Sequence, residues 1–202
     1  MPLLPPTMQG LMQAKGASFL LSGNKFPDFV SAVSAASCQY ILASAIVNST
    51  NVALGPGGGT QTGTVQGLIP TGMASLMSSK ALSVGLSGRN MNDLFESVSF
   101  GVCNGMSAAT LQGTIIGAGP GTGIGKITGL VPTALEGAIY AQTIFRVLTG
   151  KNIRDIIAAM SFGICNYIMA SAFVMCTDIG VAASPPAGPV VIPAAPGIGR
   201  LV

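Results

Sequence analysis

The stretch GNKFPD at residues 23–28 returns twice in altered form, as GRNMND at residues 88–93 and as GKNIRD at residues 150–155. Each copy opens with glycine, closes with aspartate and is followed ten positions after the aspartate by a cysteine, so the register between copies needs no gap. An internal repeat of this kind organises a whole fold. The repeat-equivalent positions are Asp28, Asp93, Asp155, Cys38, Cys103 and Cys165.

The repeat extends in both directions from this stretch. A Pro-Thr pair precedes each copy, and a glycine-rich segment follows the first two, as GPGGGTQTG at residues 55–63 and GPGTGIGKITG at residues 119–129. We therefore divide the chain into repeat 1 (1–69), repeat 2 (70–131) and repeat 3 (132–202), which together form one compact unit. Repeat 3 ends in a proline-rich C-terminal tail, SPPAGPVVIPAAPGIGRLV. The Pro-Thr pairs are Pro6-Thr7, Pro70-Thr71 and Pro132-Thr133.

Each repeat predicts two helices. The first begins at the proline, whose fixed φ suits the first helical turn, and ends at the repeated glycine, which suits the position just after a helix. The second and longer helix begins near the repeated aspartate, where a carboxylate complements the helix dipole. These long helices are expected over residues 25–50, 90–115 and 152–177, and their many Ala, Ser, Gly and Cys residues allow close packing.

The expected fold class is mainly α. Three tandem helix–helix units are joined by glycine-rich loops, each followed by a short Val/Ile segment that pairs as a strand. One helix pair cannot enclose a core, so the three units pack together, either around a pseudo-threefold axis or as a linear stack.

The composition points to a covered surface. Hydrophobic residues make up 49% of the 202 residues, enough for a core, but only 7% are charged, against roughly a quarter in an average soluble domain. Neighbouring subunits or lipid would remove the need for a charged exterior. The net charge of +3 is scattered, which argues against nucleic acid as a partner. The start, MPLLPPTMQG, has no basic n-region and predicts a protein that is not exported.

The sequence favours a protein that is not an enzyme and has no catalytic, cofactor-binding or metal-binding residues. Histidine is absent, which removes the commonest general base and metal ligand. The three repeated cysteines lie between apolar neighbours and are expected to be buried thiols acting as small hydrophobes; the alternative is a soft-metal site where they converge. The three repeated aspartates are expected to stabilise helix starts, with a cation-binding ring as the alternative. Cys176 has no counterpart and is expected to be inert.

The segment GAGPGTGIGKITG at residues 117–129 resembles a phosphate-binding loop but departs from its pattern. The pattern needs glycine where Pro120 stands and serine or threonine where Ile127 stands. A turn-forming linker is the preferred interpretation.

A membrane protein with a three-helix bundle is the main rival. Between Asp155 and Asp178 lie 22 uncharged residues, enough to span roughly 30 Å of hydrocarbon. The matching stretch of repeat 1 is rich in Ser, Asn and Gln, which disfavours a span facing lipid.

The proline-led helix pairs and the segment GPGTGIGKITGLVP at residues 119–132, set in a low-charge chain rich in Gly and Ala, resemble small virion structural proteins of tailed phages. The resemblance implies a component of the tail, baseplate or neck, built with threefold or sixfold symmetry and located in the virion after assembly in the host cytoplasm. The implied partners are other virion proteins and copies of the chain itself, with no small-molecule substrate. A metal-dependent enzyme using the cysteines is the weakest alternative.

Overall fold

The elements follow one another in the order helix, helix, strand, strand, and this order occurs three times along the part of the chain that the structure describes. The computed structural model describes residues 3–53, 59–116, 122–178 and 195–201. The elements are α1 (Pro5–Ser18), α2 (Phe26–Ser44), β1 (Ile46–Ala53), β2 (Gly59–Gln66), α3 (Pro70–Ser83), α4 (Arg89–Ala108), β3 (Thr110–Ile116), β4 (Thr122–Thr128), α5 (Pro132–Phe145), α6 (Ile153–Ser171), β5 (Phe173–Asp178) and β6 (Ala195–Leu201).

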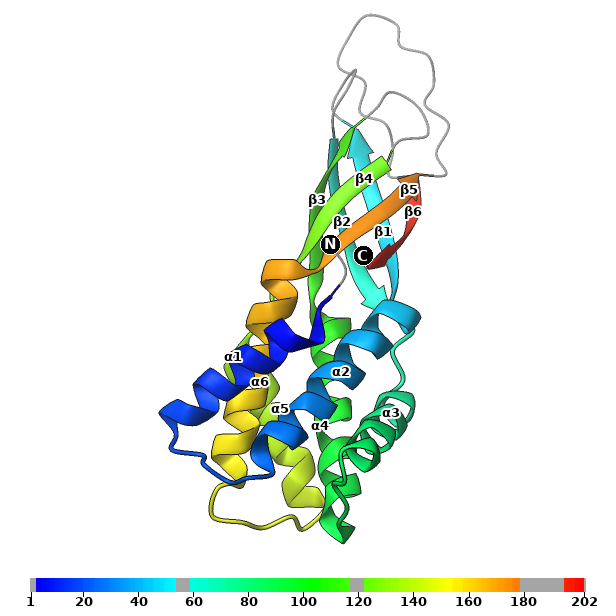
Figure 1. Ribbon diagram of the computed structural model, residues 1–202. Coiled ribbons are helices and arrows are strands. Elements are labelled where there is room, and N and C mark those ends of the chain that lie inside the picture. The colour runs from blue at the N-terminus through cyan, green and yellow to red at the C-terminus, as the bar shows by residue number, and fades with distance from the viewer. Residues whose placement is uncertain (1–2, 54–58, 117–121, 179–194, 202) are drawn as a thin grey trace, which may run out of the picture.

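The helices form a bundle and the strands form a barrel that continues from one end of it (Figure 1). Each helix packs against the next in sequence, and α6 packs against α1. Each strand pairs antiparallel with the next, and β6 pairs with β1 to close the barrel. Since both rings close, the three units surround one axis and are not stacked in a line. A single hydrophobic cluster runs through the bundle and into the barrel.

The expectation of a mainly α fold with short β segments is wrong, because the β-structure is a complete six-stranded barrel. The glycine-rich segments that were expected to be linkers supply most of two strands, β2 and β4. In β4 the glycines Gly123 and Gly125 face inward, while Ile124 and Lys126 face outward. Glycine at alternate positions leaves room inside a narrow barrel, and β-branched residues between them favour the extended backbone.

The expected long helices extend too far. α2, α4 and α6 end at Ser44, Ala108 and Ser171, and the last residues of each expected helix instead begin a strand. In repeat 1 the burial changes there to a period of two: Val47 and Ser49 are buried, whereas the residues between and beside them are exposed. This alternation is the pattern of a strand with one face in a core.

Near the bundle, paired side chains from neighbouring strands fill the barrel interior in layers. Its first layer consists of three cross-strand pairs, one from each hairpin: Val47 with Val65, Leu111 with Ile127, and Val174 with Leu201. The next layer pairs a small residue with glycine in every hairpin: Ser49 with Gly63, Gly113 with Gly125, and Cys176 with Gly199.

Farther from the bundle, the buried Gln61 side chain lies inside the barrel. Its amide Nε2 donates to the Ser49 hydroxyl at 3.0 Å, and a Cβ added to Gly123 would lie 2.6 Å from its Oε1. Between its first layer and Gln61 the barrel interior is therefore packed.

The short helices begin at Pro5, Pro70 and Pro132, so the equivalent of Pro70 is Pro5 and not Pro6 as the Pro-Thr pairs suggested. Counted from these prolines, each repeated cysteine follows 33 residues later (38 − 5, 103 − 70 and 165 − 132). The repeat therefore has no gap from the first helix to the cysteine.

Each short helix ends in a Schellman motif, in which the residue in the left-handed region is not the repeated glycine. The left-handed residues are Leu20, Gly85 and Val147, with φ values of 59°, 70° and 57°. The residue after each donates its N–H back to the last turn, as from Leu21 to the Gly16 carbonyl at 3.1 Å. The expectation that the repeated glycine ends the first helix is thus wrong. Its carbonyl instead accepts an N–H from the start of the long helix, as Gly23 does from Phe26 at 2.9 Å.

We expect Leu20→Gly to stabilise the protein. A non-glycine residue in the left-handed region costs about 1 kcal/mol, and the Leu20 side chain is 87% exposed, so little packing is lost. Urea unfolding followed by circular dichroism should give a free energy of unfolding higher by about 1 kcal/mol. The reverse change at the equivalent position, Gly85→Leu, should lower it by a similar amount. If both substitutions raised the free energy of unfolding, or both lowered it, the Schellman motif would be contradicted.

Two tyrosines join the long helix of one repeat to the short helix of the next. The N–H of Ile69 donates to the Tyr40 hydroxyl at 3.2 Å, and the N–H of Leu4 donates to the Tyr167 hydroxyl. Both N–H groups belong to the residue just before a helix, so the tyrosines fix where α3 and α1 begin. The second of these bonds connects repeat 3 to repeat 1 and so helps to close the ring.

Candidate functional site

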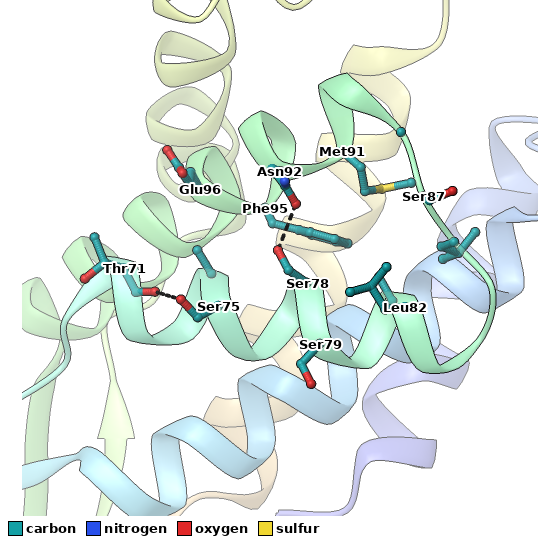
Figure 2. A pocket seen from close by; sticks show the side chains of 14 residues that line it. Thr71, Ser75, Ser78, Ser79, Leu82, Ser87, Met91, Asn92, Phe95 and Glu96 are labelled. Atoms are coloured by element: carbon teal, nitrogen blue, oxygen red, sulfur yellow. Dashed lines mark hydrogen bonds between the residues drawn. The ribbon is translucent and has the colours of Figure 1, made fainter.

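A groove of about 650 Å³ lies between α3 and the start of α4. Figure 2 shows the serine-bearing face of α3 on one side and Asn92, Phe95 and Glu96 of α4 on the other. The Ser78 hydroxyl donates to Asn92 Oδ1 at 3.0 Å across the groove. Its polar lining consists mainly of Thr71, Ser75, Ser78, Ser79, Asn92 and Glu96, and its apolar lining of Leu82, Leu86, Met91 and Phe95.

The groove is open because repeat 2 carries small side chains where repeat 3 carries large ones. Repeat equivalence adds 62 residues from repeat 2 to repeat 3, as from Cys103 to Cys165. Ser78 is therefore equivalent to Tyr140, and Asn92 to Arg154. In repeat 3 the Arg154 guanidinium lies over the Tyr140 ring, 5.7 Å from its centroid. Those two side chains occupy the space that Ser78 and Asn92 leave free.

In repeat 1 a different ring fills the same region. Phe26 is equivalent to Met91, and Gly16 to Ala81, by the 65-residue shift from Cys38 to Cys103. A Cβ added to Gly16 would lie 2.5 Å from the Phe26 ring, so the ring packs directly on the backbone of α1. Repeats 1 and 3 thus each place an aromatic ring where repeat 2 has its groove.

An ion-pair cluster borders the groove. Arg146, just after α5, lies 2.5 Å from Glu96 Oε2 and 3.5 Å from Asp93 Oδ1. The carboxylates are more than a third exposed, so we assign the cluster no more than about 1 kcal/mol of stability. Its structural effect is to hold the end of α5 beside the groove.

The three repeated aspartates have different surroundings. Asp28 and Asp155 lie in the first turns of α2 and α6, where a carboxylate faces the helix dipole. Asp93 lies farther along α4, because α4 begins earlier, at Arg89. Asp28 pairs with Lys25 at 3.5 Å, whereas Asp93 pairs with Arg146. Among the described residues, no three His, Cys, Asp or Glu side chains come together as a metal site, so neither an aspartate ring nor a cysteine ring is assembled.

The repeated cysteines are buried thiols in the long helices. Cys38, Cys103 and Cys165 are each at most 2% exposed. Burial raises the pKa of Cys38 to about 12 and the pKa values of Cys103 and Cys165 to about 11. Because only the thiolate is a good nucleophile, these groups are unreactive at neutral pH. Cys176 is also buried, inside the barrel.

We expect the native thiols to resist alkylation across the pH range in which a free thiol ionises. Raising the pH from 8 to 10 should greatly accelerate iodoacetamide labelling of the urea-unfolded chain but leave the folded chain nearly unlabelled, as intact-mass spectrometry would show. Because the unfolded thiols lose protons above their ordinary pKa near 9 while the folded ones do not, stability should fall as the pH rises above 9. Rapid native labelling of Cys38 at pH 8 would contradict its burial.

The glycine-rich segment that resembles a phosphate loop forms a strand where it is described. Residues Thr122–Thr128 are β4, and the Lys126 ammonium lies 5.1 Å from the centroid of the Phe173 ring on β5. Residues 117–121 lie outside the described part of the chain. A lysine on the outer face of a strand has no helix N-terminus beside it, which a phosphate loop requires.

Comparisons with protein-family models, with curated proteins and with solved structures find no match to this chain.

Apolar side chains are exposed at equivalent positions of the three repeats. The residue just before each short helix is aliphatic, and Leu4, Ile69 and Val131 are 42%, 60% and 52% exposed. All three lie where the barrel meets the bundle. A second group lies at the C-terminal ends of the short helices, far from the barrel, and comprises Leu20, Leu82, Val84, Ile144, Phe145 and Val147. Exposed apolar residues gathered in this way mark surfaces for other molecules.

One described helix, Ile153–Ser171, is long and apolar enough to cross a membrane by length and composition alone. Half of its apolar window is buried inside the protein, and α1 and α5 pack against it. A core helix of a protein that never enters a membrane passes the same test.

Proposed function

We propose that this protein is a non-enzymatic structural subunit of a tailed-phage virion, placed on the axis of the tail or baseplate. The observation that carries the proposal is the closure of three equivalent units around one axis. A single chain with this arrangement offers a threefold-symmetric neighbour three similar surfaces at once. The resemblance of the sequence to virion proteins of tailed phages supports the same role.

The exposed ring of Leu4, Ile69 and Val131 supports a symmetric partner. These residues occupy the same position in the three repeats, so one rotation about the axis brings each near the place of the next. A threefold or sixfold ring around the junction of barrel and bundle would cover all three, and burying each aliphatic side chain would contribute roughly 1–2 kcal/mol. The low charge, 7% of residues, suits a surface that other subunits cover.

The packed interior of the barrel favours a structural role over a role as a channel. Its interior is occupied by aliphatic pairs, then by the glycine layer, then by Gln61. Closure leaves no unpaired strand edge over the described strands, which protects a protruding rod from edge-to-edge aggregation. A narrow packed rod on a broader helical base suits an axial projection.

Quantitative mass spectrometry of density-gradient-purified particles tests this proposal. We expect peptides of the chain at a small fixed ratio to a major virion protein, unchanged by a second round of purification. Peptides that disappear on repurification, or that are recovered in the membrane fraction of uninfected cells expressing the chain, would contradict it.

An integral membrane protein is the second candidate, because α6 meets the length and hydropathy criteria for a span. Flotation of the expressed chain with membranes after a carbonate wash distinguishes the two functions. Retention in the floated membranes supports the membrane candidate, and release supports the virion subunit.

A further inference from the structure

Repeats 1 and 3 hold aromatic side chains in the region where repeat 2 has its groove. The equivalent regions of the other two repeats show what fits there: Phe26 packs on Gly16 in repeat 1, and Tyr140 lies under Arg154 in repeat 3. In repeat 2 the residues equivalent to these rings are Met91 and Ser78. The rest of the groove floor, including the buried Phe95 ring, remains apolar.

The chain also exposes an aromatic side chain beside this groove. Phe145 is 80% exposed at the end of α5 and is followed by Arg146, which binds Glu96 on the groove's edge. Ile144 before it and Val147 two residues after it are also exposed. An exposed phenylalanine with exposed aliphatic residues near it is costly in water, and aromatic residues are enriched in protein interfaces.

We propose that Phe145 of one copy inserts into the groove of a second copy. Because Arg146 holds the end of α5 next to the groove, the donor and the acceptor lie on neighbouring parts of one surface. A twofold rotation can then fill both grooves at once, which gives a closed dimer. The proposal concerns contact between copies of this chain and does not depend on the virion role.

The residues that line the groove determine how it would bind the Phe145 ring. The Phe145 ring would pack against Leu82 and Met91, above the buried Phe95 ring, and methionine sulfur attracts aromatic rings. The serine hydroxyls of α3 would face the backbone that carries the ring. Ser78 keeps its hydrogen bond to Asn92 at the groove wall.

Sedimentation equilibrium over a hundredfold range of concentration tests the proposal with two variants that act on opposite halves of the contact. Phe145→Ser removes the donor, and Ser78→Tyr fills the acceptor with the residue found in repeat 3. We expect the wild type to dimerise and each variant to associate at least tenfold more weakly. The matched control, Leu20→Ser, removes an equally exposed apolar side chain from the same end and should leave the dimer constant within twofold.

Mixing the two variants gives the decisive result. The Phe145→Ser chain keeps an intact groove and the Ser78→Tyr chain keeps an intact Phe145. The mixture should therefore form a heterodimer through one of the two contacts, more tightly than either variant pairs with itself. Circular dichroism checks that both variants are folded. A wild type that stays monomeric, association that survives both substitutions, or a mixture no more associated than its components would each overturn the proposal.

Discussion

Replacing Gly113 with alanine should lower the free energy of unfolding by about 3 kcal/mol, the upper end of the usual cost of overpacking, because the site cannot relax. A Cβ at this position would lie 2.5 Å from the Cα of Gly125 and 2.5 Å from the carbonyl oxygen of Ile124. Both atoms belong to the backbone of the neighbouring strand, so no rotation of a side chain can relieve the overlap. Urea unfolding monitored by circular dichroism measures the loss.

The matched control is Gly137→Ala in α5. A Cβ there meets nothing within 4 Å, and the residue is exposed on a helix. Alanine is the better helix former, so the control should gain about 1 kcal/mol. If Gly113→Ala cost no more than a few tenths of a kcal/mol, the glycine layer would not be a close contact between strands.

Ending the chain after residue 194 should abolish cooperative unfolding. The change removes β6 (Ala195–Leu201), which pairs with both β5 and β1. The barrel would lose Leu201 from its first aliphatic layer, and two long strands would gain unpaired edges that promote aggregation. We expect aggregated protein, or a soluble chain with no unfolding transition in circular dichroism.

The control for this truncation is Arg200→Thr. The Arg200 side chain is exposed on the outer face of β6, and threonine stands at the equivalent position, Thr64, in β2. This variant should unfold with nearly the wild-type midpoint. A truncated chain that retained the wild-type transition would show that residues 195–201 are a dispensable tail.

The repeat itself was predictable, because the aspartate and cysteine positions are separated by ten residues in all three copies. That spacing located the long helices, although their ends were expected too far along the chain, and proline located the starts of the short helices to within one residue. The barrel was not predicted because glycine has no side chain to reveal a strand, and segments such as GTGIGKIT are equally typical of loops. The alternation of glycine with threonine, isoleucine and lysine in β4 was the missed signal.

The C-terminal segment was misinterpreted for a related reason. The prolines of SPPAGPVVIPAAP suggested a tail, but the following residues GIGRL match GIGKI of β4. Aligning them pairs Arg200 with Lys126 and Leu201 with Ile127, which are the equivalent outward and inward positions of the barrel. Cys176 also has counterparts in the barrel, Ser49 and Gly113, each paired with an inward glycine. Ser49 follows from the 127-residue shift between Cys38 and Cys165, whereas Gly113 lies one residue before the position that the 62-residue shift gives.

The groove could not be predicted from repeat 2 alone. Ser75, Ser78 and Ser79 suggest only a polar helix face, and the groove results from what the equivalent residues of the other repeats do in space. Tyr140 stands at the position equivalent to Ser78, and its contact with the Arg154 guanidinium shows that an aromatic ring fills this region in repeat 3.

Disulfide trapping between β1 and β6 tests most directly whether the three repeats close around one axis. Ile46 faces outward on β1 and is the Cα partner of Arg200 on β6 and of Gln66 on β2. Directly paired strand residues lie within the distance that a disulfide spans. Oxidation of the Ile46→Cys/Arg200→Cys chain should therefore give an intramolecular bond as efficiently as Ile46→Cys/Gln66→Cys does within its hairpin. A bond in the hairpin pair with none between positions 46 and 200 would contradict the closed barrel.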